Sequence, residues 1–194
     1  STLMRSSAAS DVYKRQALHK AQRLEELINE FFDITRFSLS HLALSKQEVN
    51  LSRMLEQLTY EFQPLLVEKE LSWTLELAPN VRVLCDPDKL ERVFDNLFRN
   101  AVHYSYGQTA IAVRLEQTGT QVAVRVENRG KTIPPEKLGQ IFEQFFRLDS
   151  ARGTTTGGAG LGLAIAKEIV ELHGGTISAE SQDERIAFTV RLPL

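Results

Sequence analysis

Two asparagines in a predicted helix are the first residues whose types and spacing suggest chemistry. Asn96 and Asn100 lie one helical turn apart on one face of a helix predicted from Lys89 to about Tyr104. Asparagine is a poor helix former, and its amide is costly to bury without a partner. Two stacked amides among bulky apolar residues therefore indicate a polar ligand, or a hard cation such as Mg²⁺ held by amide oxygens. Helix-capping or surface asparagines are the alternative interpretation.

A glycine-rich run leads into a second helix that suits an anion. Gly158, Gly160 and Gly162 precede or begin an apolar helix predicted from Leu161 to Leu172. Free N–H groups at a helix N-terminus bind phosphate readily where no side chains obstruct the approach. The run has no Gly-Lys-Ser/Thr and no strand directly before it, which argues against a Walker A loop and a Rossmann unit. A flexible linker is the alternative, but the continuation into a helix favours phosphate binding.

A turn after a predicted strand carries groups that suit a planar ligand. In the segment Val126–Pro134, Gly130 lets the backbone approach a ring closely, and Asn128 can form hydrogen bonds with the edge of a heterocycle. Most strand ends have such turns, so this signal is weak when it is taken alone.

An aromatic and basic segment follows, from Ile141 to Arg147. We expect Phe142 and Phe145 to anchor this segment to the core. Arg147 and Arg152 can each reach a phosphate from a loop, because the guanidinium fork matches phosphate oxygens. A solvated surface charge is the alternative for each arginine.

The composition limits the class of protein. The chain has 194 residues, of which 42% are hydrophobic and 25% charged, and its net charge of -2 gives no general attraction to nucleic acid or anionic membrane. No stretch approaches the roughly 18–20 apolar residues of a membrane span, so we expect a cytoplasmic protein. The single cysteine, Cys85, lies in a predicted buried strand, where packing is the expected role.

The elements that position these residues are predicted from hydrophobic periodicity. We expect a helix from Ala17 to about Phe37, a polar connection over Ser45–Asn50, helices over Leu51–Phe62, Lys89–Tyr104, Pro135–Phe142 and Leu161–Leu172, and strands over Leu71–Leu77, Val81–Cys85, Ile111–Leu115, Val122–Val126, Thr176–Ser181 and Arg185–Leu192. The strand Val81–Cys85 is expected to pair with Leu71–Leu77. The predicted fold class is α+β, an α/β sandwich with helices on one face of a mixed, mostly antiparallel sheet.

Three domains are expected along the chain. Residues 1–16 show no helical or strand periodicity and are interpreted as a non-native or disordered tail. Residues 17–48 form an amphipathic helical segment whose apolar stripe requires a partner helix. Residues 49–194 form the α/β domain.

Taken in this order, the motifs resemble those of the ATP-binding catalytic domain of sensor histidine kinases, the GHKL or Bergerat fold. The matching residues are Asn96 and Asn100 for the N box, Asn128, Gly130 and Ile133 for the G1 box, Phe142 to Arg147 for the F box, and Gly158, Gly160 and Gly162 for the G2 box. The resemblance covers Ala17–Leu194, and several segments especially resemble the vancomycin-resistance sensor kinases of the VanS type.

This resemblance implies ATP and Mg²⁺ as ligands. It implies that Asn100 binds Mg²⁺, that Asn96 lies near the phosphates, and that Asn96 and Arg147 are catalytic. The residues implied to bind the nucleotide are Asn96, Asn100, His103, Tyr104, Asn128, Gly130, Ile133, Arg147, Arg152, Gly158, Gly160, Leu161, Gly162 and Leu163. The sequence departs from the family pattern where Asn128 replaces an aspartate, Thr132 replaces a glycine and His103 replaces a lysine.

The histidines complete the sequence-based hypothesis. None of His19, His41, His103 and His173 lies in the family's phosphoacceptor context, and His173 is expected to cap a helix end or to interact with the helix dipole. Residues 17–48 then resemble the second dimerisation helix, and we expect this fragment to bind ATP without phosphorylating itself. The implied partners are a response regulator receiver domain and a second copy of the full-length protein, which would reach the membrane through N-terminal segments missing here.

Two alternatives stay open. One is a non-catalytic, nucleotide-responsive dimerisation module. The other, less favoured, is a GHKL ATPase of the gyrase or MutL kind, which uses a glutamate as general base where this chain has Asn96.

Overall fold

The computed structural model describes residues 20–21, 44–148 and 160–194 of the chain. The chain divides into two compact units, Ser1–Leu42 and Ala43–Leu194, and the fold described below is that of the second unit. The predictions for residues 1–16 and for most of the helix from Ala17 lie outside the described residues, although Lys20 and Ala21 are helical. Arg152 and Gly158 lie outside them as well.

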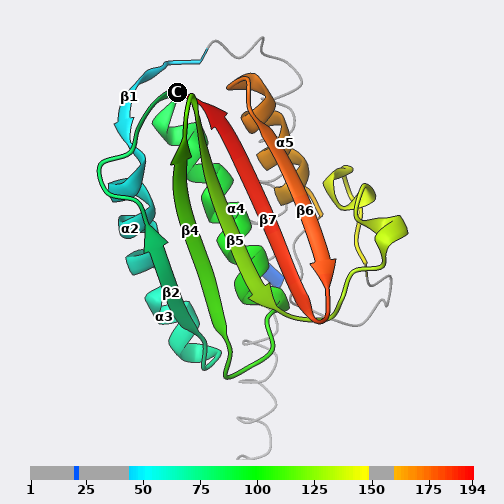
Figure 1. Ribbon diagram of the computed structural model, residues 1–194. Coiled ribbons are helices and arrows are strands. Elements are labelled where there is room, and N and C mark those ends of the chain that lie inside the picture. The colour runs from blue at the N-terminus through cyan, green and yellow to red at the C-terminus, as the bar shows by residue number, and fades with distance from the viewer. Residues whose placement is uncertain (1–19, 22–43, 149–159) are drawn as a thin grey trace, which may run out of the picture. The chain divides into compact units, whose positions relative to one another are not determined.

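A five-stranded sheet forms the centre of this unit (Figure 1). Its strands, in spatial order, are β2 (Ser72–Leu77), β4 (Ala110–Thr118), β5 (Gln121–Arg129), β7 (Arg185–Pro193) and β6 (Thr176–Gln182). The β2–β4 pair is parallel, and the other three pairs are antiparallel. The predicted mixed, mostly antiparallel sheet is therefore confirmed.

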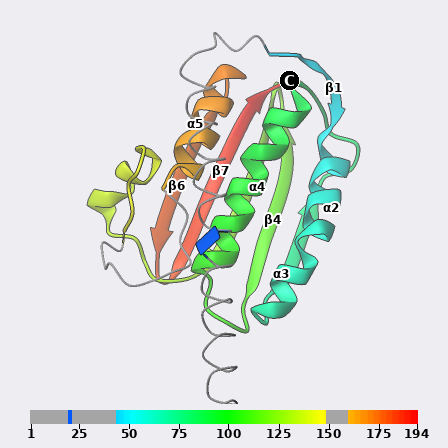
Figure 2. The same ribbon diagram turned by 180° about the vertical axis from the view of Figure 1, so that it is seen from behind.

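Helices cover one face of the sheet, as the view from behind shows (Figure 2). They are α2 (Leu51–Glu61), α3 (Gln63–Glu68), α4 (Pro87–Tyr104) and α5 (Gly162–Leu172), accompanied by the 3₁₀ turns η1 (Pro135–Lys137) and η2 (Gln140–Phe142). The predicted α+β sandwich is confirmed by this arrangement. None of the helices in the described ranges is long and apolar enough to cross a membrane.

Helix α4 is the central helix, and its sequence explains why it forms. The side chain of Asp86 caps its N-terminus by accepting a hydrogen bond from the Lys89 N–H, and Pro87 occupies the first turn. Its apolar stripe is buried and consists of Leu90, Val93, Phe94, Leu97, Phe98, Ala101 and Val102. Phe98 packs edge-on against Phe62 of the α2–α3 junction, with ring centroids 5.6 Å apart. Burial of each such ring stabilises the fold by about 2–3 kcal/mol.

Several predicted elements need correction. The expected polar connection contains a strand, β1 (Gln47–Asn50), and this strand pairs with β3 (Arg82–Cys85) in a separate two-stranded sheet. The predicted pairing of Val81–Cys85 with Leu71–Leu77 is therefore wrong, because β2 lies along β4 instead. The polar sequence of β1 shows no strand periodicity, so its pairing comes from tertiary contacts alone.

Two local predictions also differ from the structure. Helix α3 was not predicted; it follows a break at Phe62 and has Pro64 in its first turn. The helix expected over Pro135–Phe142 consists instead of the two short 3₁₀ turns, which suits a segment with little apolar periodicity.

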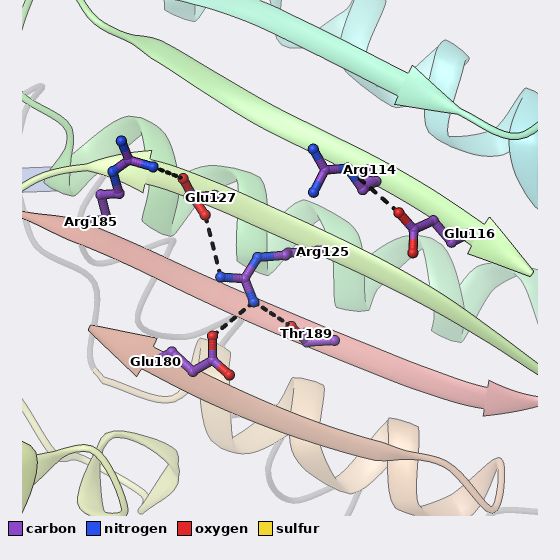
Figure 3. A network of polar contacts seen from close by, with 7 residues as sticks. All are labelled: Arg114, Glu116, Arg125, Glu127, Glu180, Arg185 and Thr189. Carbon is purple, nitrogen blue, oxygen red and sulfur yellow. Dashed lines mark hydrogen bonds and ion pairs between the residues drawn. The ribbon is translucent and has the colours of Figure 1, made fainter. Parts of the chain in front are cut away.

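The sheet face opposite the helices carries a network of polar side chains, six charged residues and one threonine (Figure 3). It comprises Arg114, Glu116, Arg125, Glu127, Glu180, Arg185 and Thr189. At its centre, the Arg125 guanidinium lies 2.9 Å from a Glu180 oxygen and 3.3 Å from a Glu127 oxygen. Arg125 and Glu127 are half-buried and Glu180 is exposed, and ion pairs so close to solvent add little stability.

Candidate functional site

The polar face of α4 is the starting point of the candidate site. Asn96, Asn100 and His103 project from it, and all three are partly buried. The amide nitrogen Nδ2 of Asn96 is buried and has no hydrogen-bond partner among the residues that the structure describes. A buried donor without a partner costs free energy, so this amide is suited to an external acceptor.

The N-terminus of α5 lies against Asn96. A β-carbon at Gly162 would be 3.0 Å from Oδ1 of Asn96, so a larger residue there would require the Asn96 side chain to shift by a few tenths of an ångström. Helix α5 begins after Leu161, and no side chain of the described residues caps it. Its first N–H groups therefore remain available to an anion beside the Asn96 amide, as the phosphate-binding prediction requires.

The residues before the undescribed segment 149–159 are tied to those after it. The Phe145 N–H donates to the Gly160 carbonyl at 3.0 Å. Gly160 has a φ of +81°, and a β-carbon there would lie 2.9 Å from the Phe146 carbonyl oxygen. Glycine is thus required at this position by both its backbone conformation and its packing.

The prediction that Phe145 anchors the segment 141–147 to the core is wrong. The residue is 64% exposed, so its ring is not packed in the core, and its backbone φ is +64°. Phe142 does contact the core, because its ring lies edge-on to Phe188 of β7 with centroids 6.4 Å apart.

The turn after β5 is held against the C-terminal end of α4. A β-carbon at Gly130 would collide with the Tyr104 carbonyl oxygen, so glycine is needed for this approach. The Tyr106 N–H donates to the Arg129 carbonyl at 2.8 Å, which fixes the same junction. Tyr104 itself is exposed at 41% and lies beside His103, with ring centroids 4.6 Å apart.

Asn128 lies on the inner face of β5, directly before this turn. Its side chain is only 2% exposed, and Nδ2 has no hydrogen-bond partner within the described part of the chain. Among the described residues, two buried amide nitrogens thus lack partners, those of Asn96 and Asn128, and the sequence predicted ligand contacts for both residues.

Other elements hold this turn through contacts that the sequence did not reveal. The Ile133 N–H donates to the Ser181 hydroxyl at 2.9 Å, and the Gly130 N–H donates to the Glu184 carbonyl at 2.9 Å. Thr132 accepts a hydrogen bond from the Glu184 N–H, so this departure from the family pattern has a structural role. Ser181 and Glu184 lie about fifty residues along the chain, and no local pattern signals such contacts.

The basic groups of the site surround His103. Burial lowers the pKa of His103, and the nearby positive charges of Lys69 and Arg147 lower it further. Lys69 also donates to the Val102 carbonyl at 3.0 Å and so caps the C-terminal end of α4. Sequence reasoning missed Lys69, since it lies in a different helical segment. At neutral pH, His103 is therefore a neutral group beside two cations.

A hydrogen bond between Asp86 and His173 holds the opposite end of α4. His173 is 4% exposed; its Nε2 accepts from the Asp86 N–H at 3.0 Å, and its Nδ1 lies 2.7 Å from the Ile169 carbonyl. His173 thus caps the end of α5, as predicted, and also joins it to the start of α4. Cys85 is buried next to this contact, and burial raises the pKa of its thiol to about 11, which agrees with a packing role.

No cluster of three or more histidine, cysteine or acidic side chains suited to a metal occurs in the described ranges. Asn100 offers an amide oxygen, which is a kind of ligand that Mg²⁺ accepts.

The uncapped N-terminus of α5 lies beside the partnerless amide of Asn96, and the Gly130 turn is held against the C-terminal end of α4. In an α/β sandwich, this arrangement is a candidate site for an anion and a ring. The matching protein family explains this combination. Residues 85–194 match the family described as histidine kinase-, DNA gyrase B-, and HSP90-like ATPase, and the chain belongs to this family.

Similar proteins support the predicted resemblance to VanS-type sensor kinases. Sensor protein VanSC of Enterococcus gallinarum is 54% identical over 188 residues, which cover 97% of this chain and 52% of that protein. Sensor protein VanS of Enterococcus faecium is 47% identical over 181 residues, which cover 93% of this chain and 47% of that protein. The chain thus spans about half the length of these curated relatives.

The fold also matches a solved histidine kinase. The histidine kinase ThkA, in complex with the response regulator protein TrrA, superposes with a TM-score of 0.77 at 27% identity, over 93% of this chain and 50% of that chain. The predicted family and fold are therefore both confirmed.

Proposed function

We propose that this chain is the ATP-binding catalytic part of a two-component sensor histidine kinase. It transfers the γ-phosphoryl group of ATP to a histidine in the family's phosphoacceptor context, which none of its own four histidines has. The observation that carries the proposal is the uncapped N-terminus of α5 packed against the partnerless amide of Asn96. Family membership and the similarity to sensor proteins support it.

The chain's own groups bind and orient the triphosphate in this proposal. The first N–H groups of α5, from Gly162 and Leu163, and the Asn96 amide donate to phosphate oxygens. Arg147 contributes positive charge from the segment that precedes 149–159. In the transfer, the bond from the γ-phosphorus to the bridging oxygen breaks, a bond to the histidine nitrogen forms, and ADP leaves. Catalysis then consists mainly of positioning and stabilisation of charge.

Mg²⁺ fits this site through Asn100. The Asn100 side chain lies on the same helical face as Asn96, and an amide oxygen is a ligand that Mg²⁺ accepts. The triphosphate would provide most of the remaining ligands, since no acidic cluster accompanies Asn100 in the described parts of the chain. The ion would neutralise charge on the phosphates.

The base lies against the turn after β5 in this arrangement. Asn128 and Gly130 face the purine, Tyr104 packs beside it, and Ile133 lines the same turn. Gly160 and Leu161 precede the phosphate-binding helix. Arg152 and Gly158, in the segment outside the described residues, complete the proposed nucleotide contacts.

The proposed partners follow from the kinase function. The solved ThkA complex contains a response regulator protein, and we infer a response regulator receiver domain as the acceptor here. The full-length protein would be a homodimer with its catalytic part in the cytoplasm. The similarity to the VanS proteins also suggests a role in glycopeptide resistance.

The ATPase alternative is less well supported. A hydrolase of this fold needs a carboxylate to activate water, and Asn96 cannot accept that proton. A non-catalytic nucleotide-responsive module would use the same binding site, so phosphotransfer has to be tested after binding.

An ATP titration with and without Mg²⁺ tests the proposal. We expect the full chain to bind Mg²⁺–ATP, and the Asn100→Ala variant to bind it at least about tenfold more weakly, because one charge-assisted contact is lost. Glu91→Ala is the matched control: Glu91 is exposed on the opposite face of α4, and this variant should bind like the parent.

Two outcomes would contradict the proposal. One is the absence of binding to the parent at millimolar ATP. The other is Mg²⁺-dependent binding without transfer of the γ-phosphoryl group to a separately supplied helical hairpin carrying the phosphoacceptor histidine, which would favour the non-catalytic module.

A further inference from the structure

Asn128 has a buried side-chain amide whose N–H donor has no acceptor among the described residues. It is 2% exposed, and its Nδ2 has no hydrogen-bond partner among the described residues. It lies on the same buried face of β5 as Val124 and Val126. Two residues later, Gly130 is fixed by Glu184 and packed against the Tyr104 carbonyl, so the end of the strand is rigidly held.

We propose that Asn128 makes the site accept purine nucleotides with a 6-oxo group as well as those with a 6-amino group. This inference rests on the proposed binding of ATP and adds a base specificity to it. The family pattern has an aspartate at this position, and a carboxylate only accepts hydrogen bonds. It therefore matches the 6-amino group of adenine and opposes a 6-oxo oxygen, which is also an acceptor.

An amide combines an acceptor and a donor in one planar group. With adenine, Oδ1 of Asn128 accepts from the 6-amino group, and Nδ2 donates to ring nitrogen N1. A half-turn of the amide exchanges the two atoms. Nδ2 then donates to a 6-oxo oxygen, and Oδ1 accepts from the N1–H of the same base. Each base is thus satisfied by a neutral pair of hydrogen bonds.

The surroundings of Asn128 permit this exchange. No protein acceptor within the described parts of the chain holds Nδ2 in one orientation. The residue opposite Asn128 on β7 is Ile186, which is buried and apolar and offers no hydrogen bond from its side chain. The orientation of the amide is therefore set by the bound base.

The test compares ATP with inosine triphosphate, since these nucleotides differ only at position 6 and in the proton on N1. Both are titrated into the full chain with Mg²⁺, in competition with a fluorescent ATP analogue. We expect the two dissociation constants to agree within about tenfold, because one neutral pair of hydrogen bonds replaces another.

The Asn128→Asp variant is the matched comparison, as it changes only the amide to a carboxylate. We expect it to favour ATP over inosine triphosphate by at least about tenfold more than the parent does, because the carboxylate opposes the 6-oxo oxygen. Glu127→Gln, a change on the outward face of β5, should leave the parent's ratio unchanged.

The outcomes separate this inference from the proposed function. A parent that binds ATP more than about tenfold more tightly than inosine triphosphate contradicts the inference but sustains ATP binding. A folded Asn128→Asp variant with the same ratio of the two dissociation constants as the parent would also contradict the inference and sustain ATP binding. If that variant does not fold, the ratio measured for the parent decides. Binding of neither nucleotide contradicts both the inference and the proposed function.

Discussion

The polar groups at the N-terminal end of α4 have hydrogen-bond partners, whereas a buried polar group in its later turns has none among the described residues. At the N-terminal end, Asp86 accepts from Lys89 and from the Ser45 N–H, and its own N–H donates to His173. Burial raises the pKa of Asp86, but these hydrogen bonds outweigh burial and bring the pKa below its ordinary value. Further along, the buried Nδ2 of Asn96 finds no partner in the described parts of the chain.

This difference distinguishes polar groups that stabilise the fold from polar groups that are suited to bind a ligand. The contact between His173 and Asp86 joins the end of α5 to the start of α4, and it leaves no ring nitrogen unused. The Asn96 amide and the uncapped start of α5 lie together and leave donors unused. Substitutions at the first end should therefore change stability, and substitutions along the later turns should change binding.

The largest expected effect is on stability, at His173. We expect His173→Ala to lower the free energy of unfolding by about 2–4 kcal/mol, because it creates a cavity and leaves the buried Asp86 N–H without an acceptor. Denaturant unfolding of the parent and the variant measures this change. Leu172→Ala, an exposed neighbour in α5, is the control and should cost less than about 1 kcal/mol. Equal losses for the two variants would show that the His173 contact is not structural.

The next effect is on binding, at Asn96. We expect Asn96→Ala to weaken ATP binding at least tenfold, by about 1.4 kcal/mol or more, because a donor to the phosphates is lost. Its unfolding free energy should stay the same or rise by up to about 1 kcal/mol, since alanine favours helix and the partnerless donor disappears. Calorimetric titration and denaturant unfolding of the same sample measure both quantities. If Asn96→Ala loses stability but keeps its affinity for ATP, Asn96 stabilises the fold and does not bind the nucleotide, which would contradict this prediction.

The smallest expected effect concerns pH, at His103. The pKa of His103 lies below its ordinary value, so the ring is neutral in the free protein at neutral pH. A bound triphosphate favours the protonated ring. Binding therefore takes up a proton, and affinity should rise about threefold as the pH falls from about 8 to about 6.

His103→Gln is the control for the titration of ATP itself, because glutamine has a similar polarity and does not titrate. His103→Lys carries a permanent charge and should bind ATP more tightly than the parent at about pH 8. If the parent and His103→Gln show the same pH dependence, the ring does not contact the phosphates.

The sequence predicted those parts of the molecule that local patterns determine. The Asp86 cap, the apolar stripe of α4 and the β4–β5 hairpin all depend on neighbouring residues, and the structure confirms them. The pairing of β1 with β3 and the contact between Asp86 and His173 depend on residues far apart in the chain. No periodicity encodes such contacts, which explains the wrong partner predicted for Val81–Cys85.

The candidate site shows the same division. Asn96, Asn128 and the glycines were predicted because a polar or glycine residue in an apolar element stands out. Lys69, Ser181 and Glu184 were missed, since each is ordinary in its own segment and acts only through the fold. Phe145 is exposed and has a positive φ, and an aromatic residue type signals neither property.

The most direct test is the melting temperature of the parent, Asn96→Ala and His173→Ala, each measured with and without Mg²⁺–ATP. At a nucleotide concentration about 100 times the dissociation constant, binding stabilises the folded state by about 2.7 kcal/mol. We predict that ATP raises the melting temperature of the parent and of His173→Ala equally, although His173→Ala melts lower. We also predict that Asn96→Ala melts no lower than the parent and responds to ATP far less. An Asn96→Ala variant that melts below the parent and keeps the full response to ATP would contradict the assignment of α4's later turns to nucleotide binding.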